Sequence, residues 1–279
     1  MVAYPHNRRA APLPVHFVRR TETPDALPAP ASYPERPHRN MRTRQTLNLG
    51  SDRFRVGPWQ GTTDVAYLGV TVDPPRPSLT GLRKCLRVLS DKGFTSVVTA
   101  ALHPSEAGAF EEAGFTELDR LMVLSHDLLD LNPPRRPVSS GVRIRWALPN
   151  DRAKAIEVDH RAFQSFWQLD RPGLRDAETA TPARRFRVAA AGSHIVGYAV
   201  TGRSGRQGFL QRLAADPDHA GSGIGSALVV DAMRWADRHG VRRMLVNTQY
   251  ENERARALYE RLGFRPTSTY LVVLTRALP

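Results

Sequence analysis

Apolar positions in the second half of the chain follow two patterns, a short continuous run and a helical periodicity. A short apolar run at 210–215 has the length of a buried strand, and Asp216-Pro217 stops it. Apolar residues then recur at helical spacing over a wide arc as far as His239-Gly240, a typical helix end. The elements that this pattern predicts are a strand at 210–215, a helix at 223–239, a strand at 243–248 and a helix at 252–262.

The same order of elements occurs once before, in a fainter form. The earlier strand also ends in Asp-Pro, at Asp73-Pro74, and Gly114-Phe115 corresponds to Gly263-Phe264. The predicted elements are a strand at 65–72, a helix at 79–91, a strand at 94–100, a helix at 104–113 and a strand at 121–128. Duplication of a half-domain would produce this order.

Proline and polar clusters divide the chain. Residues 1–50 are rich in Pro, Arg and Ala without apolar periodicity, so we expect this segment to be largely disordered. Stacked prolines mark a linker at 132–140, because they continue neither a helix nor a strand. The predicted domains are 51–131 and 141–279. Within the second we expect a strand at 142–147, a helix from Asn150 to Phe163, a hairpin of 184–191 and 194–201, and a final strand from Tyr270.

The turn after the strand at 210–215 is rich in glycine, at Gly221, Gly223 and Gly225. These residues fall on the first turn of a helix, where backbone N–H groups lack helical acceptors and the helix dipole is positive. Glycine has no Cβ, so an anion approaches this backbone closely. The turn therefore predicts a phosphate site. A dinucleotide-binding fold is excluded, because residues 216–220 separate the strand from the first glycine and no acidic residue ends the next strand.

Two motifs carry a family resemblance. The strand end Leu213-Ala214-Ala215-Asp216-Pro217, the glycine turn and the block from Asn252 to Phe264 resemble the GCN5-related N-acetyltransferase (GNAT) superfamily. Its second motif, Asn-x-x-Ala-x-x-Leu-Tyr-x-x-x-Gly-Phe, is matched in full, whereas Ala220 stands where the family usually has Gln or Arg. The resemblance covers 141–279. It implies the α/β (α+β) class and the GNAT fold, a mixed central sheet flanked by helices, with a partial degenerate GNAT copy before it.

The resemblance implies a role for each motif residue in binding acetyl-CoA as co-substrate. The backbone of Leu213, Ala214 and Ala215 would receive the pantetheine arm and the thioester. Asn252 would contact the cofactor arm, and Tyr259 would contact the cofactor and protonate the departing thiolate. The backbone amides that would cradle the pyrophosphate belong to Ala220, Gly221, Ser222, Gly223, Ile224, Gly225 and Ser226. No metal is expected, because no Cys/His cluster has metal-ligand spacing.

A general base is not evident, because the strands around the glycine turn carry no carboxylate. A chain of water molecules, or an amine that is already neutral, would make a base unnecessary. The candidates by proximity in sequence are Glu251, His219, His160 and Asp159.

The segment 163–170 occupies the acceptor-binding region of the family. Ile156, Phe163 and Trp167 are predicted to be core residues rather than ligand contacts, whereas Asp170 or Glu178 would meet a cationic amine.

The first copy has lost this chemistry. Pro75 and Pro77 stand in its turn and remove N–H donors. Phe110 occupies the place of Tyr259, and His103 that of Asn252. We therefore expect the first copy to be structural, or to form one wall of the acceptor site.

Composition narrows the classes of partner and the cellular compartment that we expect. The formal net charge of +13 invites a nucleic-acid partner, but the charge is nearly all Arg and no helix interleaves basic with aromatic residues. We expect a solvated basic surface and no nucleic acid. No apolar run approaches the roughly 18 residues of a membrane span, so no membrane partner is expected. The single cysteine, Cys85, lies among leucines and indicates a buried thiol in a reducing, cytoplasmic compartment.

The leading hypothesis is an acetyl-CoA-dependent N-acetyltransferase acting by direct attack of a primary amine. The final block resembles ribosomal-protein N-terminal acetyltransferases, which implies a peptide α-amine or protein N-terminus. The two-copy layout resembles mycothiol synthase, which implies a small amino-sugar thiol. The alternative class is a non-catalytic acyl-CoA-binding sensor or interaction protein. A third hypothesis makes the basic residues of 1–50 a nucleic-acid tether.

Overall fold

The computed structural model describes residues 41, 43–71, 76–129 and 141–279. The chain forms two compact units. Unit 1 contains Arg120–Leu271, and unit 2 contains the described residues up to Asp119 together with Val272–Pro279. The predicted linker, Pro75 and most of the predicted disordered segment lie outside the described residues.

Unit 1 is built on a sheet with the strand order β11-β5-β10-β9-β8-β7-β6. The pair β9–β10 is parallel, whereas β6–β7, β7–β8, β8–β9 and β5–β10 are antiparallel. The strands are β5 (Thr116–Asp127), β6 (Val142–Trp146), β7 (Ala183–Ala191), β8 (His194–Ser204), β9 (Gln207–Ala215), β10 (Arg243–Gln249) and β11 (Arg265–Ala277). The helices are α3 (Asp151–Ala162), η2 (Ser165–Trp167), α4 (Arg171–Thr179), η3 (Pro217–His219), α5 (Ile224–Arg238) and α6 (Glu253–Arg261).

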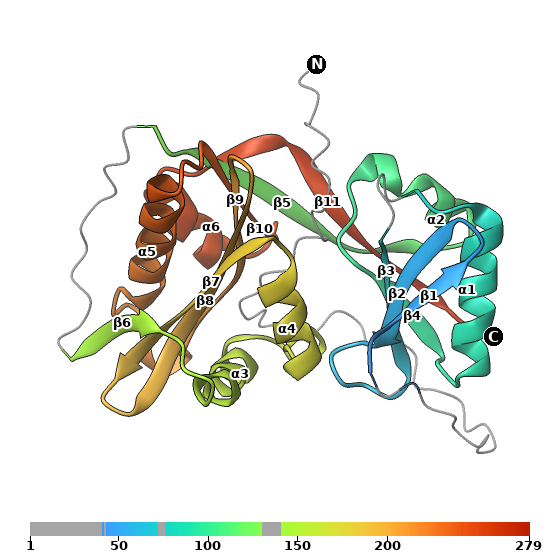
Figure 1. Cartoon of the computed structure of the whole chain (residues 1–279), viewed down its shortest axis with the longest axis horizontal. Coiled ribbons are helices and arrows are strands. Elements are labelled where there is room, and N and C mark those ends of the chain that lie inside the picture. The colour runs from blue at the N-terminus through green and yellow to red at the C-terminus, as the bar shows by residue number, and fades with distance from the viewer. Residues whose placement is uncertain (1–40, 42, 72–75, 130–140) are drawn as a thin grey trace. The chain divides into compact units, whose positions relative to one another are not determined.

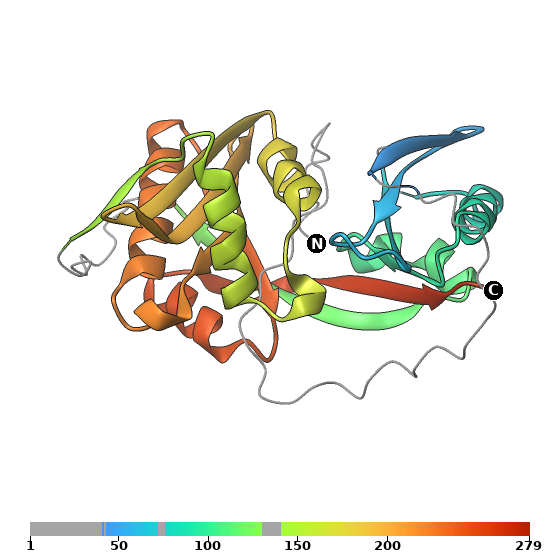
Figure 2. The same ribbon diagram turned by 90° about the horizontal axis from the view of Figure 1, so that it is seen from below.

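Helices cover both faces of this sheet, because successive side chains of the central strands point to opposite faces. On β8, a Cβ added to Gly197 would lie 2.7 Å from Ile224 of α5, so Gly197 permits close packing of that helix. The next residue, Tyr198, points the other way and donates a hydrogen bond to Asp159 of α3. Figure 1 accordingly shows α5 and α4 on opposite sides of β7, β8 and β9, and Figure 2 shows α3 beside α4.

Unit 2 has the strand order β1-β2-β3-β4-β11. Its first helix begins at Ser78, whose hydroxyl accepts the Gly81 N–H, while Asp52 of β2 accepts the Ser78 N–H at 2.9 Å. Cys85 of this helix is fully buried, as predicted. The elements besides β11 are β1 (Gln45–Leu49), β2 (Asp52–Pro58), β3 (Val65–Val70), α1 (Leu79–Asp91), β4 (Ser96–Thr99), η1 (Pro104–Glu106) and α2 (Gly108–Glu112).

Each unit includes a strand segment from the other part of the sequence. In unit 2, Thr275 to Ala277 at the end of β11 pair antiparallel with β4. In unit 1, Leu121 to Asp127 of β5 pair antiparallel with β10 along its whole length. The compact units therefore do not divide at the proline-rich stretch where composition sets the boundary, because strand pairing overrides sequence order. Which unit carries activity stays a prediction.

Most predicted elements are confirmed, including both strand–helix–strand series and the β7–β8 hairpin. The prediction of disorder as far as residue 50 is wrong at its end, because Gln45–Leu49 pair with β2 across a turn in which Gly50 has φ +66°. The final strand begins at Arg265, before Tyr270. Helix α4 was not predicted.

Two predicted helices differ in detail. The helix expected at 104–113 is divided into η1 and α2, because His103 and Glu106 form a capping box around a single 3₁₀ turn. Helix α3 follows Asn150, but the Asn150 side chain makes no cap. Asp151 instead accepts the Leu148 N–H at 2.7 Å and holds the preceding turn.

Candidate functional site

Strands β9 and β10 part midway, and the candidate site begins there. They are paired at three positions, the last being Phe209 opposite Leu245. Beyond this point β9 stays paired with β8 as far as Ala215, and β10 stays paired with β5 as far as Gln249. A β-bulge at Gln211 bends β9 where the separation starts.

The separation leaves one edge of β9 directed toward the gap. The Asp216 N–H donates to Val196 of β8 at 3.0 Å, and Ala214 lies opposite Tyr198 of the same strand. Because backbone groups alternate between the two edges of a strand, Leu213 and Ala215 direct theirs toward the edge that β10 has left. An extended ligand that carries amides can pair with such an edge as a further strand would.

The glycine turn leads from this strand end into α5. Gly221 and Gly223 have φ of +81° and +79°, which a residue with a side chain adopts only with strain. Gly223 is the N-cap, and no side chain of the described residues caps the helix. The first helical bond runs from the Ala227 N–H to the Gly223 carbonyl at 2.9 Å. The N–H groups that precede this bond belong to Ile224, Gly225 and Ser226. The turn thus offers amide donors at the positive end of a long helix, as an anion site requires.

Asp216 holds the start of the turn. Its carboxylate accepts the Asp218 N–H at 3.1 Å and pairs with Arg161 of α3 at 2.7 Å. Burial raises the pKa of Asp216, but the hydrogen bonds from Arg161 and from the Asp218 backbone lower it by more, so the net pKa lies below the ordinary value. The carboxylate therefore stays charged and the turn stays anchored at neutral pH.

Asn252 begins α6, and its side chain is only partly satisfied. Its Oδ1 accepts the Ala255 N–H at 3.0 Å, which caps the helix and fixes the orientation of the amide. Its Nδ2 is buried and has no partner among the described residues. A buried donor without an acceptor is costly, so this atom is suited to a ligand.

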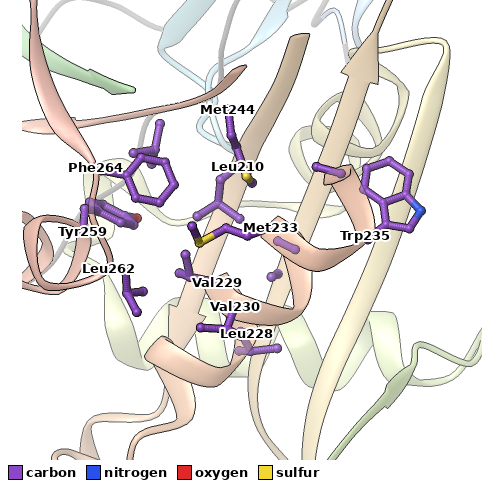
Figure 3. Packing of buried hydrophobic residues seen from close by; sticks show 14 of the residues in the cluster. Leu210, Leu228, Val229, Val230, Met233, Trp235, Met244, Tyr259, Leu262 and Phe264 are labelled. Atoms are coloured by element: carbon purple, nitrogen blue, oxygen red, sulfur yellow. The ribbon is translucent and has the colours of Figure 1, made fainter. Parts of the chain in front are cut away.

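Tyr259 projects from α6 into the core between α5, α6 and the sheet. Only 1% of its surface is exposed, and its ring centroid lies 5.8 Å from that of Phe264. Figure 3 shows the ring directed toward Leu210 of β9. Burial raises the pKa of Tyr259 well above its ordinary value. The side chain therefore keeps its proton at neutral and moderately alkaline pH.

The residues present fit acetyl-CoA in three respects: an open strand edge for the amide-bearing arm, an uncapped helix start for the pyrophosphate, and buried donors at Asn252 and Tyr259 for the arm and the sulfur. Within the described ranges, no group of His, Cys, Asp or Glu that could hold a metal ion occurs.

The four candidate bases lie in different settings. Both oxygens of Asp159 are engaged in several hydrogen bonds inside the core. His160 is exposed and bonds the Leu169 carbonyl at 2.9 Å, and Glu251 is exposed in a turn. His219 lies on η3, where its Nδ1 is buried and has no partner among the residues that the structure describes. The structure thus brings His219 to the glycine turn, and its predicted role as a base stays untested.

A buried charged cluster lies between α3 and β9, the strand that separates from β10, and was not predicted from the sequence. Asp159 and Arg212 are 0% and 1% exposed in their side chains and pair at 2.8 Å. Tyr198 donates to the same carboxylate, and Arg212 also donates to the Trp167 carbonyl at 3.0 Å and stacks on Phe163 at 3.6 Å. The signal in the sequence that could have revealed this cluster is Arg212, a charged residue inside an apolar strand. The cluster fixes the segment after α3 to β9, which supports Phe163 and Trp167 as core residues; Ile156 is only half-buried.

Asp170 and Glu178 are already engaged. Asp170 caps α4 by accepting the Gly173 N–H at 2.7 Å. Glu178 pairs with Arg152 at 2.7 Å. Asp170 thus has a structural role at the start of α4, Glu178 already has a cationic partner, and their contact with a cationic amine stays a prediction.

In unit 2, the counterparts of the site residues have structural roles. Phe110 is fully buried and packs edge-on against Phe115 at 5.3 Å. His103 caps η1 instead of offering a free amide. Pro77 is described and buried. These contacts agree with the expectation that the first copy lacks the chemistry of the second.

Comparison with known proteins gives a consistent picture. Residues 152–264 match the model of the acetyltransferase (GNAT) family. Mycothiol acetyltransferase from Saccharomonospora viridis is 29% identical over 185 residues, which are 60% of this chain and 60% of that protein. The chain thus aligns with less than two thirds of this relative's length.

Solved structures of low identity share the fold. A tandem GNAT protein from the clavulanic acid biosynthesis pathway has a TM-score of 0.57 at 18% identity, covering 82% of this chain and 79% of its own. A GCN5-related N-acetyltransferase from Sphaerobacter thermophilus has a TM-score of 0.52 at 18% identity, covering 82% and 77%. These matches confirm the predicted fold class. In the part of the chain that the structure describes, no helix has the length and apolar character needed to cross a membrane.

Proposed function

We propose, from the match of residues 152–264 to the model of the acetyltransferase (GNAT) family, that this protein transfers an acetyl group from acetyl-CoA to a primary amine. The observation that carries the proposal is the separation of β9 from β10 directly before an uncapped, glycine-rich helix start. The residues proposed to bind the cofactor are Leu213, Ala214, Ala215, the amides from Ala220 to Ser226, Asn252 and Tyr259.

The chemistry uses groups at that separation. A neutral amine attacks the thioester carbonyl, a C–N bond forms, and the oxygen becomes an oxyanion that the Ala215 N–H stabilises. The C–S bond then breaks and the sulfur leaves with its electron pair. Tyr259 donates its proton to that sulfur, the new amide nitrogen loses a proton to water, and Tyr259 is reprotonated from water.

The acceptor we favour is a small amine rather than a protein. The support is the likeness to a protein named mycothiol acetyltransferase, which suggests a thiol-bearing amino-sugar derivative. A peptide α-amine is the second class and belongs in the same screen. Calorimetric titration with acetyl-CoA tests the cofactor site whichever class of acceptor is correct.

A non-catalytic acyl-CoA sensor is the alternative, favoured by the engagement or exposure of the carboxylates around the site. A sensor would bind acetyl-CoA, acetylate no amine, and show no change in thioester hydrolysis when Tyr259 becomes Phe. An enzyme would release CoA only as acetylated amine accumulates.

The decisive experiment is a calorimetric titration with acetyl-CoA, repeated with Gly223→Pro. Saturable binding at one site per chain, lost in the variant, supports the cofactor site in the second copy. It also supports the view that the first copy is inactive. Absence of binding at millimolar acetyl-CoA, or binding that survives Gly223→Pro, contradicts the proposal. Binding is followed by an amine screen that includes amino sugars, thiol-bearing amines and peptides with a free α-amine.

A further inference from the structure

Two buried amide side chains lie where β9 and β10 begin to separate. The last paired residues are Phe209 and Leu245, and Gln211 and Asn247 each lie two residues further along their strands. Each of the two amide residues is 1% exposed.

Both amides belong to the face of the sheet opposite α5. Met244 and Val246 belong to the core that packs against α5, whereas Leu245 packs with Phe209 on the other face. Asn247 lies two residues after Leu245 and shares its face. Gln211 shares the face that Phe209 occupies and contacts Thr181, between α4 and β7. Asn252 and Tyr259, which are proposed to bind acetyl-CoA, belong to α6 and its N-cap, and α6 packs with the α5 core on the other face of the sheet.

The orientation of Gln211 is set by its neighbour. The Thr181 hydroxyl donates to the Ala183 carbonyl at 2.9 Å, so toward Gln211 it acts as an acceptor. Gln211 Nε2 donates to it at 3.3 Å. The Gln211 carbonyl oxygen is thereby directed elsewhere, and it has no partner among the described residues.

Asn247 has neither of its side-chain groups satisfied. Both Oδ1 and Nδ2 are buried without a partner in the described part of the chain. The two residues together offer two acceptors and one donor. Buried amide groups without partners destabilise a fold, so their presence indicates a ligand that supplies the missing bonds.

We propose that Gln211 Oε1 and Asn247 bind the acceptor: the two carbonyl oxygens accept hydrogen bonds from the amine nitrogen, and Asn247 Nδ2 donates to an oxygen on the neighbouring carbon of the acceptor. The proposal rests on the proposed acetyl transfer and narrows its substrate to primary amines with an N–C–C–O unit. Amino sugars and α-aminoacyl compounds share this unit, whereas simple alkyl amines lack it.

The neutrality of the two amides fits a reactive amine. A carboxylate in their place would hold the amine as an ammonium ion, which has no lone pair for attack. Arg212, which follows Gln211 in the chain, is buried in an ion pair with Asp159, so these two charges neutralise each other. Amide oxygens accept N–H bonds without requiring a positive charge.

The test uses the full chain with Asn247→Leu and Gln211→Met, which keep side-chain size and remove the polar atoms. Glucosamine and glycinamide are probes with the N–C–C–O unit, and cyclohexylamine and propylamine are probes without it. We expect each substitution to raise KM for glucosamine or glycinamide about tenfold or more, with a smaller change in kcat and an unchanged Kd for acetyl-CoA. Thr248→Val is the matched control, because the Thr248 hydroxyl is also buried with no partner in the described ranges. Thr248 follows Asn247 on the strand and so points to the opposite face, and amine KM should not change.

Thermal stability separates a ligand site from a structural one. Loss of polar atoms that have no partner should leave Tm unchanged or raised in Asn247→Leu. A Tm lowered by several degrees would overturn the inference, because it would mean that these atoms are satisfied inside the fold. Unchanged amine KM in both variants of an active protein would overturn this inference alone. Acetyl-CoA binding with no transfer to any amine would overturn the proposed function as well.

Discussion

Tyr259 and Cys85 are both buried, and burial raises the pKa of each side chain. The consequences differ because of their surroundings. Tyr259 lies in unit 1 and shares a core cluster with Leu210 of β9 and Ile224 of α5, whereas Cys85 lies on α1 of unit 2 among apolar residues. At the scale of single residues, location decides whether a retained proton is useful to the reaction or simply makes a group inert.

Replacement of Tyr259 by Phe tests its proposed role as the acid. We expect kcat for acetyl transfer to fall about 10²-fold or more with little change in KM for acetyl-CoA, because the ring is kept and only the proton is lost. Tyr250→Phe is the control, since Tyr250 is 40% exposed. A kcat within threefold of the unmodified protein in Tyr259→Phe would remove Tyr259 from the mechanism.

The pH profile gives a second test of the same residue. An acid with a raised pKa loses its proton only above the ordinary tyrosine range, so kcat should show no loss from Tyr259 as the pH rises to about 10. A descending limb near pH 8 that disappears in Tyr259→Phe would contradict the direction of the shift. Steady-state rates over the stable pH range decide this.

Cys85 is expected to be unreactive in the native protein. Burial raises the pKa of its thiol to about 12, so almost no thiolate is present at neutral pH, and the side chain is fully buried. An aromatic disulfide reagent followed by absorbance should modify no thiol in native conditions and one thiol per chain in denaturant. Fast native labelling would show that α1 opens readily.

At the scale of elements, the start of α5 combines two requirements. The chain must turn sharply after β9, and the helix must begin without a side-chain cap so that its amides stay available. Gly223 satisfies both, because φ of +79° suits glycine and glycine brings no capping group of its own.

Gly223→Ala and Gly240→Ala form a matched pair at the two ends of α5. Gly240 has φ +71°, so each substitution should destabilise the protein by about 1 kcal/mol and lower Tm similarly. Only Gly223→Ala should weaken acetyl-CoA binding, by about tenfold or more in Kd, because only that turn presents the amides. Equal Kd values for acetyl-CoA in the two variants would show that the glycine turn does not bind the cofactor. Calorimetry and thermal unfolding on the same samples provide both numbers.

Around the candidate site, the sequence predicts well those features that neighbouring residues determine. It predicts poorly those features that depend on pairing between strands far apart in the chain. The glycine turn, α5 and the Asn252 cap follow from spacing within a few residues. The bulge at Gln211 and the burial of Asn247 depend on β5, β8 and β10 together, which no local pattern contains. Helix α4 was missed because Pro172 and Gly173 resemble loop residues, although Pro suits a first helical turn.

At the scale of the whole molecule, the pairing of β11 with β4 is the feature that no reading of the sequence foresaw. Leu274 N–H donates to Thr99 of β4 at 2.9 Å, and Thr275 donates to the Val97 carbonyl at 3.1 Å. Unit 2 thus depends on the final strand for the completion of its sheet.

Deletion of Val272–Pro279 should therefore loosen unit 2 more than β6–β8 of unit 1. We expect hydrogen exchange of backbone amides to accelerate in β3 and β4, because β4 loses its partner, while amides of β7 and β8 exchange as before. Exchange followed by mass spectrometry resolves these segments. Unchanged protection in β4 would mean that β11 contributes little there; equal loss in β8 would mean that the two units unfold together.

The distance along the chain between β4 and its partner has a consequence for synthesis. Val97 and Thr275 are 178 residues apart, so the ribosome finishes β4 long before the strand that completes its sheet exists. During that interval β4 has an unpaired edge, the kind of edge that invites association with other chains. Unit 2 therefore cannot complete its sheet as β4 emerges, and this edge stays open to aggregation until β11 leaves the exit tunnel.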